Sequence, residues 1–387
     1  MSAKITQQLG RTVSLALPTV LFLFLGACTS TKYTKSSNES FVHPGLLHSK
    51  EELAFVRTKL ATREAPWDPA WKQLRRSKDS SLNYKPTPKA HVVRGVRNKT
   101  DIGSSDFTRD SGAAYTHALQ WALTGKEAHA QKAIEILNAW SSTLKSISGH
   151  DARLLVGLDG VRYCNAAELI RHSEAHWSKP DQDRFENMLR EVFYPTIKDF
   201  YPTANGNWDA SMIQTMMAMG VFLDDREMFN RAVNYYIRGK GNGNIRKYIN
   251  NIGQCQESGR DQLHVQMGLG FLGVACEIAW KQGIDLYGAY DDRLALGYEY
   301  SAKYNLGEEV PFQRFRSYKG RYDYSSISKK GRGRFRPIYE RIVHHYTKRM
   351  ERELPWSEKV TVKKRPEGTH EQHAPWGTLT AFGQPTN

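Results

Sequence analysis

Residues 256–307 read QESGRDQLHVQMGLGFLGVACEIAWKQGIDLYGAYDDRLALGYEYSAKYNLG, and this stretch decides the predicted fold. A polar segment containing a glycine, residues 257–261, leads into an apolar run at residues 263–280. The run is apolar on most of its helical faces, so it predicts a helix that is buried nearly all round. Arg260 and His264 lie one turn apart at its start and share one face. Polar residues at the start of a buried helix indicate a site.

A second helix is predicted at residues 292–305. Arg293, Gly297, Tyr300 and Tyr304 fall at steps of four, three and four along it, so they line one stripe. An arginine and two tyrosines around a small glycine leave room for a polar ligand. The alternative is that each tyrosine is a core residue whose hydroxyl finds a partner.

The rest of the chain predicts more helices in pairs and no alternation with strands. The pairs are residues 111–124 with 127–146, 160–176 with 180–201, 207–223 with 225–239, and 262–282 with 292–305, followed by a helical region at 325–348. Residues 84–110, with several prolines and glycines, predict an irregular segment that walls a cleft. This pattern predicts an all-α array of helical hairpins or a toroid.

The N-terminus predicts export. Lys4 and Arg11 precede an apolar segment, residues 13–25, that is too short to span a membrane. It ends in Leu-Gly-Ala-Cys, which resembles a bacterial lipobox with Cys28 as the lipidated residue; the alternative is an ordinary signal peptide with a chance cysteine. We therefore expect a signal peptide at residues 1–27, a tether at 28–40 and a single domain at 41–387. Because Thr29 follows Cys28, the address resembles that of an outer-membrane or periplasmic lipoprotein of a Gram-negative bacterium.

The composition is basic. The formal net charge of +15 falls to +13 when Lys4 and Arg11 leave with the signal peptide. Such a charge indicates an anionic partner. Export argues against nucleic acid, and an acidic polysaccharide fits both charge and compartment, with a basic surface lacking any specific partner as the alternative.

Beyond Cys28, the three cysteines at 164, 255 and 276 cannot all pair, and no cysteine or histidine spacing resembles a zinc site. We expect no metal and no cofactor, and the sequence does not indicate the oligomeric state.

Several segments resemble the alginate-lyase-type polysaccharide lyases. They are Gly259–His264, Glu277–Tyr287, the segments around Arg293–Leu294, Glu299–Tyr300 and Lys303–Gly307, the hairpin from Ala113 to Trp140, and Asn205–Trp208. The resemblance runs from about residue 45 to residue 380. It implies an incomplete (α/α) toroid with a long cleft, of about six to seven hairpins. It also implies β-elimination on a uronate polymer, alginate or a glucuronan-like chain.

Elimination at a uronate requires three groups. The sugar carboxylate must be neutralised, a base must take the C5 proton, and an acid must protonate the departing O4. The resemblance makes Asn207 the neutralising amide; the alternative is a helix N-cap before Trp208. It makes His264 the base or a neutralising group, the alternative being a core histidine. Tyr300 is the predicted acid, with Tyr304 as second choice.

The remaining site residues are predicted to assist Tyr300 or to bind substrate. Arg293 would tune Tyr300 or hold the carboxylate; the alternative is an ion pair with Asp291 or Asp292. Arg260, Gln262, Tyr304 and Trp208 are expected to bind substrate. The chain departs from the family's best-known branch, which carries an adjacent Asn-His pair, because Trp208 follows Asn207 here. The histidine must then come from another element.

Two further segments suggest roles in binding. Residues 239–244, GKGNGN, lack the features of a phosphate loop. They predict a mobile loop that would cover the cleft. Residues 320–336 interleave arginine and lysine with Tyr322, Tyr324 and Phe335. That mixture suits stacking on sugars and pairing with carboxylates, and it equally suits a solvated basic face.

Two other functions fit the same composition. An inverting glycoside hydrolase on an α/α toroid would need two cleft carboxylates about 6.5–9.5 Å apart. Asp209, Glu257 and Asp261 are the candidates. A non-catalytic surface lipoprotein would bind the polysaccharide without shortening it.

Overall fold

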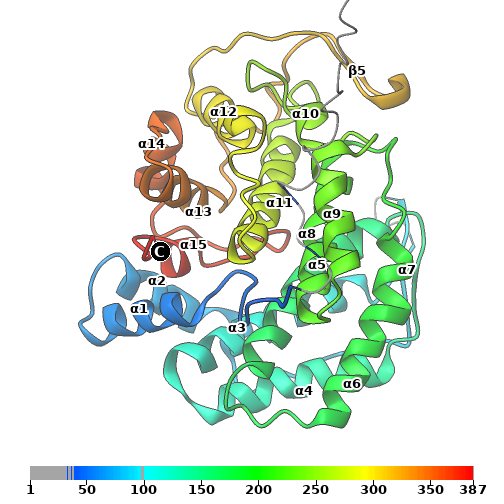
Figure 1. Cartoon of the computed structure of the whole chain (residues 1–387), viewed down its shortest axis with the longest axis vertical. Helices are drawn as coiled ribbons and strands as arrows, with labels where there is room; N and C mark the ends of the chain where they lie inside the picture. Colours follow the sequence, from blue (N-terminus) through cyan, green and yellow to red (C-terminus); the bar gives the residue numbers. More distant parts are fainter. Residues whose placement is uncertain (1–32, 34–35, 37–38, 97–99, 387) are drawn as a thin grey trace, which may run out of the picture.

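The computed structural model describes residues 33, 36, 39–96 and 100–386, and helices dominate it (Figure 1). The α-helices are α1 Lys50–Ala61, α2 Trp67–Arg76, α3 Ser104–Thr124, α4 Glu127–Thr143, α5 Ala152–Arg171, α6 Lys179–Met188, α7 Tyr194–Ile197, α8 Gly206–Phe222, α9 Arg226–Arg238, α10 Ile245–Tyr248, α11 Gln262–Lys281, α12 Ala289–Asn305, α13 Tyr339–His344, α14 Pro355–Lys364 and α15 Gly377–Thr380. The structure also describes two 3₁₀ turns, η2 Lys78–Ser80 and η5 Tyr318–Gly320, and two π-helical turns, η4 Leu189–Phe193 and η6 His345–Arg349. The expected signal peptide and Cys28 lie outside the described residues, as does most of the expected tether.

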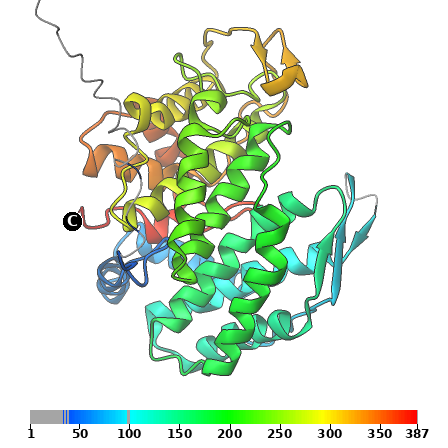
Figure 2. The ribbon, with the colours of Figure 1, turned by 45° about the vertical axis from the view of Figure 1, so that its right-hand side comes forward.

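Four helices form an inner row in the order α3, α5, α8, α11, each packed against the next. They run parallel. Thr108 near the start of α3 bonds Asp159 on α5, and Trp121 near its end bonds Ser173 just beyond α5. Helices α4, α9 and α12 return along the preceding inner helix, and α6 packs on α4 (Figures 1 and 2). This arrangement is the predicted incomplete (α/α) toroid.

The parallel inner row brings the N-termini of α3, α5, α8 and α11 to one end of the molecule, which we call the mouth. Unpaired backbone N–H groups and the aligned peptide dipoles make helix N-termini attractive to anions. The mouth is therefore suited to a negatively charged ligand before any side chain is considered.

Helix α11 is buried along most of its length. It is long and apolar enough to span a membrane, yet it lies mostly buried inside the protein, which identifies it as a core helix. Its glycines allow close packing: a Cβ on Gly268 would lie 2.0 Å from the hydroxyl oxygen of Tyr248, and one on Gly273 would lie 2.9 Å from Cδ1 of Ile342. The expectation of a helix buried nearly all round is met, because small residues let neighbours reach its backbone.

Short strands complete the fold. Strand β1, His91–Arg94, pairs antiparallel with β2, Asp101–Ile102, and parallel with β3, Ser146–Ser148. Strands β4, Phe315–Arg316, and β5, Asp323–Tyr324, form a separate hairpin. The expected irregular segment at 84–110 is therefore only partly irregular, because it holds β1, β2 and the first turns of α3.

The glycine-rich segment 239–244 differs from its prediction. Asn242 donates to the carbonyl of Ala204 at 2.6 Å, and Asn244 caps α10. A Cβ on Gly241 or Gly243 would lie 2.2 or 2.4 Å from a side-chain atom of Asp209. The expectation of a mobile loop over the cleft is wrong, because these glycines let the segment pack tightly beside the start of α8.

Candidate active site

Asn207 lies in the first turn of α8, at the mouth. Asn205 occupies the N-cap position, so the alternative that Asn207 caps the helix is wrong. The side chain of Asn207 is buried, and its one polar contact with the described residues is Nδ2 to the Met267 sulfur at 3.7 Å. Its Oδ1 has no hydrogen-bond partner in the described part of the chain. A buried polar atom left unpaired costs roughly 1–3 kcal/mol, which calls for an explanation such as a ligand.

Glu257 ties α8 to the segment before α11. Its carboxylate is fully buried and accepts hydrogen bonds from the Asn207 backbone N–H at 3.2 Å, the Tyr248 hydroxyl at 3.2 Å and Arg260 at 2.7 Å. Burial raises the pKa of Glu257, and the charges of Arg260 and His264 offset part of that rise. The carboxylate therefore fixes Asn207 and Arg260 relative to each other.

His264 is oriented by Asp261, the N-cap residue of α11. The Asp261 carboxylate accepts from the backbone N–H groups of Leu263 and His264, and its Oδ2 lies 2.7 Å from Nδ1 of His264. Burial acts to raise the pKa of Asp261, but the hydrogen bonds from His264 outweigh it and lower the pKa to about 2. An ionised Asp261 keeps the proton on Nδ1, so Nε2 is the acceptor. The His264 side chain is 31% exposed, which leaves it accessible.

A tyrosine reaches this cluster from the β4–β5 hairpin. A Cβ on Gly259 would lie 2.3 Å from Cβ of Tyr324, so glycine is required for the hairpin to lie this close. Burial, and then the charge of Glu257, raise the pKa of Tyr324 to about 12, while Arg260 acts to lower it. Tyr324 therefore keeps its proton near neutral pH. The mixture of basic and aromatic residues at 320–336 suggested that this segment binds sugars. The sequence alone did not indicate that the hairpin lies beside the cluster around His264.

The hairpin is fixed at both of its ends. Gln254 and Gln313 exchange two hydrogen bonds at 2.8 and 2.7 Å before β4. After β5, the Ser328 N–H donates to the carbonyl of Ser258, and the Gln262 N–H donates to that of Lys330. The Gln262 amide nitrogen also donates to the carbonyl of Ser328 at 2.9 Å. Gln262, predicted to bind substrate, is instead buried and holds the hairpin against α11.

The predicted stripe on α12 does not form a ligand site. The Tyr300 hydroxyl donates to the carbonyl of Pro311 at 2.7 Å, and Arg293 donates to that of Ile249 at 3.2 Å. Gly297 provides space for packing rather than for a ligand, since a Cβ there would lie 2.6 Å from Cδ1 of Ile249. The Tyr304 ring is covered by the guanidinium of Arg332 at 4.0 Å. The structure thus separates Arg293, Tyr300 and Tyr304 from the role predicted for them. It supports the core alternative for Tyr300, whereas the buried Tyr304 hydroxyl has no hydrogen-bond partner among the described residues.

The alternative, an ion pair of Arg293 with Asp291 or Asp292, is not seen among the described residues, and Asp292 pairs instead with Arg352 at 3.0 Å. Residues 290–292 adopt left-handed backbone conformations, so regular helix starts only at Arg293. This irregular start turns Arg293 toward α10 and the Ile249 carbonyl.

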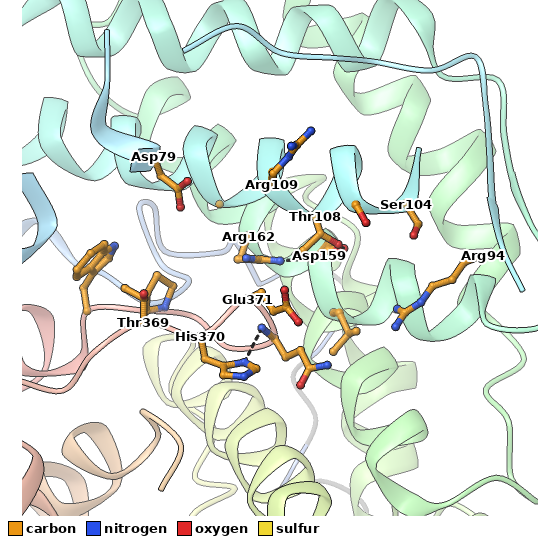
Figure 3. Close-up of a pocket in the computed structure, with 16 residues that line it drawn as sticks. Asp79, Arg94, Ser104, Thr108, Arg109, Asp159, Arg162, Thr369, His370 and Glu371 are labelled. Atoms are coloured by element: carbon orange, nitrogen blue, oxygen red, sulfur yellow. Dashed lines mark hydrogen bonds and ion pairs between the residues drawn. The ribbon is translucent and has the colours of Figure 1, made fainter. Parts of the chain in front are cut away.

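A cavity of about 460 Å³ adjoins the mouth (Figure 3). Its walls come from η2, the end of β1, the start of α3, the middle of α5 and the C-terminal segment at 369–376. They carry the cations Arg94, Arg109 and Arg162 as well as His370. Burial, and then Arg336 and Arg162, lower the pKa of His370 to about 4, so this histidine is neutral near pH 7. The sequence did not indicate this cavity, since its residues are distant along the chain and form no motif.

Arg336 lies on the cavity side of the mouth, and Trp208 lies on its outer side. Burial lowers the pKa of Arg336, while the charges of Glu371, which lines the cavity, and Asp261, which orients His264, act to raise it. On the other side, Trp208 packs edge-on against Tyr201 at 5.4 Å and His150 at 5.7 Å. Trp208 is half-buried beside Asn207, where an aromatic face could contact a sugar.

The three carboxylates that were candidates for the catalytic pair of a hydrolase are engaged in other contacts. Glu257 is buried against Arg260, and Asp261 caps α11. Asp209 is buried and accepts from the Tyr201 N–H at 2.7 Å and the Tyr235 hydroxyl at 2.8 Å. Burial raises its pKa to about 6. None of the three is a free carboxylate facing the mouth.

One cluster in the described residues has the ligand types of a metal site: His43, Glu168 and His172. The two imidazole rings stack at 4.2 Å and 12°, so a metal ion cannot lie in the planes of both. Nδ1 of His43 is instead 2.7 Å from Glu168 Oε1. Burial acts to lower the pKa of His43, but Glu168 and Asp224 outweigh it and raise the pKa above 6.5. The cluster is an ion pair at the end of α5 away from the mouth.

Comparisons with known proteins agree with this geometry. The model of the alginate lyase family matches residues 56–312. An alginate lyase from Bacteroides ovatus has a similar structure, with a TM-score of 0.63 and 16% identity over 89% of this chain and 100% of that one. Alginate lyase A1-III from Sphingomonas species A1 gives a TM-score of 0.61 and 15% identity over 88% and 98%. A variant of A1-III complexed with a tetrasaccharide gives 0.59 and 16% over 89% and 98%. No curated protein sequence matches the chain.

The family model covers well over half of the chain, and the solved structures share its helical toroid over nearly their whole length. The chain therefore belongs to the alginate lyase family and is a polysaccharide lyase.

Proposed function

We propose that this lyase cleaves a uronate polymer, alginate or a glucuronan-like chain, by β-elimination at the mouth. The observation that carries the proposal is the cluster of Asn207, Arg260, His264 and Tyr324 where α8, α11 and the hairpin meet. It supplies an amide and a cation for a carboxylate, an accessible imidazole nitrogen and a protonated phenol. The alginate lyases with similar structures favour alginate as the first substrate to test.

The chemistry assigns one role to each group. The uronate carboxylate accepts hydrogen bonds from Arg260 and from Nδ2 of Asn207, and these donors stabilise the negative charge that develops when C5 loses its proton. His264 Nε2 accepts that proton as the C5–H bond breaks. The C4–C5 double bond forms, the C4–O4 bond breaks, and Tyr324 donates its proton to the departing O4. Tyr324 thus replaces Tyr300, the acid expected from the sequence, because the Tyr300 hydroxyl is committed to a backbone carbonyl.

The direct test is a substrate panel. The purified domain is incubated with alginate, polymannuronate, polyguluronate, glucuronan and hyaluronan, and the ultraviolet absorbance of an unsaturated uronate is followed. We expect absorbance to rise with at least one of the uronate polymers. New reducing ends without absorbance would indicate the hydrolase. Binding without either signal would indicate the non-catalytic lipoprotein that binds the polysaccharide without shortening it.

We also propose that the chain is exported and anchored through lipid on Cys28. The Leu-Gly-Ala-Cys sequence after an apolar segment supports this. Mass spectrometry of the N-terminal peptide from a Gram-negative host should show a lipid-modified Cys28 as the first residue. An unmodified N-terminus, or cleavage at another residue, would contradict the anchor.

A further inference from the structure

An open groove lies on the outer side of the β4–β5 hairpin, and we call it the outer groove. Its volume is about 670 Å³, and it runs between the loop after α7, the C-terminal half of α9 and the turn of the hairpin. It is lined by Asp199, Phe200, Pro202, Thr203, Arg231, Asn234, Tyr235, Arg238, Gly239, Lys240, Tyr318 and Lys319. No catalytic group assigned above faces it.

The lining is basic and aromatic. Arg231, Arg238, Lys240 and Lys319 contribute four cations, against the single carboxylate of Asp199. The half-buried Tyr235 ring stacks on Phe200 at 3.6 Å, and Tyr318 adds another half-buried ring. Flat rings suit contact with the apolar faces of sugars, and cations suit their carboxylates. The charge and shape favour an acidic polysaccharide over a neutral ligand.

The groove is held in a fixed shape by the surrounding backbone. Arg231 donates twice to the carbonyl of Lys198, at 3.1 and 2.7 Å. The Tyr318 N–H donates to Asn242 at 2.7 Å, and Lys247 donates to the carbonyl of Lys240 at 2.5 Å. The Tyr235 hydroxyl is bound by Asp209, close to the start of α8. A preformed groove binds a chain at a lower entropic cost than a loose surface does.

The groove opens beside the mouth. Tyr201, between the lining residues Phe200 and Pro202, contacts Trp208, and the Arg321 guanidinium lies 5.8 Å from its ring. Trp208 is the neighbour of Asn207 in sequence. The hairpin also contributes to both places, with Tyr318 in the groove and Tyr324 at the mouth. A polymer that leaves the mouth past Trp208 therefore meets the groove next.

We propose that the outer groove binds a second stretch of the anionic polysaccharide, several sugars away from the bond being cleaved. The inference rests on the proposed function, and it adds a binding site outside the catalytic cluster. The groove raises affinity for long chains and has no part in the chemistry, so its effect depends on substrate length.

The test compares two double variants that each remove two exposed lysines. Lys240→Ala with Lys319→Ala removes cations from the groove. Lys359→Ala with Lys363→Ala removes the same charge from α14, which lies on the other side of the molecule in Figure 1. We expect the groove variant to raise KM for a long polymer about three- to tenfold, as for the loss of two exposed charge contacts. Its kcat, and its KM for a trisaccharide, should match those of the control. A polymer KM equal to the control's, or an equal rise for the trisaccharide, would overturn the proposal.

A binding assay separates this proposal from the proposed catalytic function. Electrophoresis through gels containing alginate, glucuronan or neutral dextran measures binding whether or not the protein turns over its substrate. The groove variant should be retarded less than the control by an acidic polymer, and dextran should retard neither. Equal retardation by the acidic polymers would overturn the groove even if cleavage is confirmed. Weaker retardation of the groove variant would support it even if no unsaturated product forms.

Discussion

The start of α11 and the stripe on α12 carry the same kinds of residue, but the structure brings only the first set together with polar groups of neighbouring elements. Arg260 and His264 lie at the N-terminus of an inner helix, where neighbouring inner helices also begin. Arg293, Tyr300 and Tyr304 lie along a helix that returns outside the inner row, and they contact backbone carbonyls or the core. Position along the toroid, rather than residue type, decides which polar group can meet a ligand.

The largest effect that tests this difference is expected for Tyr324→Phe. The substitution removes one hydroxyl and keeps the ring that packs on Gly259. If the phenol protonates O4, kcat should fall by about 10²–10⁴. Initial rates on the best polymer measure this, and circular dichroism checks the fold. Retention of more than about a tenth of kcat would remove Tyr324 from the role of acid.

The next largest effect is expected for Asn207→Ala. Loss of one preorganised donor to the developing negative charge should lower kcat by about 10²–10³. The protein should melt at nearly the same temperature, because the Asn207 side chain lacks a strong hydrogen bond to lose. A clear loss of stability with normal turnover would instead show that this amide is structural.

Tyr300→Phe is the matched control from the other region. It removes the hydrogen bond to the Pro311 carbonyl, so we expect a loss of about 0.5–1.5 kcal/mol in unfolding free energy. The kcat should stay within about twofold of the wild type, well short of a catalytic loss. Urea denaturation and initial rates give the two quantities. A dead Tyr300→Phe with an active Tyr324→Phe would reverse our assignment.

The smallest effect is expected at the far end of α5. Because the pKa of His43 is raised in the folded protein, its ion pair with Glu168 adds stability that is fully present below pH about 6.5 and is lost as the pH rises through the folded value. His43→Gln should therefore destabilise the protein more at about pH 5.5 than at about pH 8.5, with little change in kcat. Equal destabilisation at both pH values would show that the charge of His43 contributes nothing to the free energy of unfolding.

The sequence predicted the paired helices well because helical periodicity and glycine spacing are local signals, but the helical region expected at 325–348 begins only at Tyr339. The buried character of α11 and the position of His264 at its start followed directly. The stripe on α12 failed because a helical stripe shows which residues share a face and not what that face contacts. The sequence could not predict the position of Tyr324 or the cavity around Arg162 and His370. Each depends on segments that are distant along the chain and meet only in the tertiary fold.

The most direct test of the central claim counts two products of the same reaction. Each cut by elimination creates one new reducing end and one unsaturated uronate, so reducing-sugar and ultraviolet assays on alginate or glucuronan should rise in a constant one-to-one ratio. The wild type and Tyr300→Phe should show this ratio at similar rates, while Tyr324→Phe should show almost no product. Reducing ends that accumulate without unsaturated uronate would contradict the elimination at the mouth.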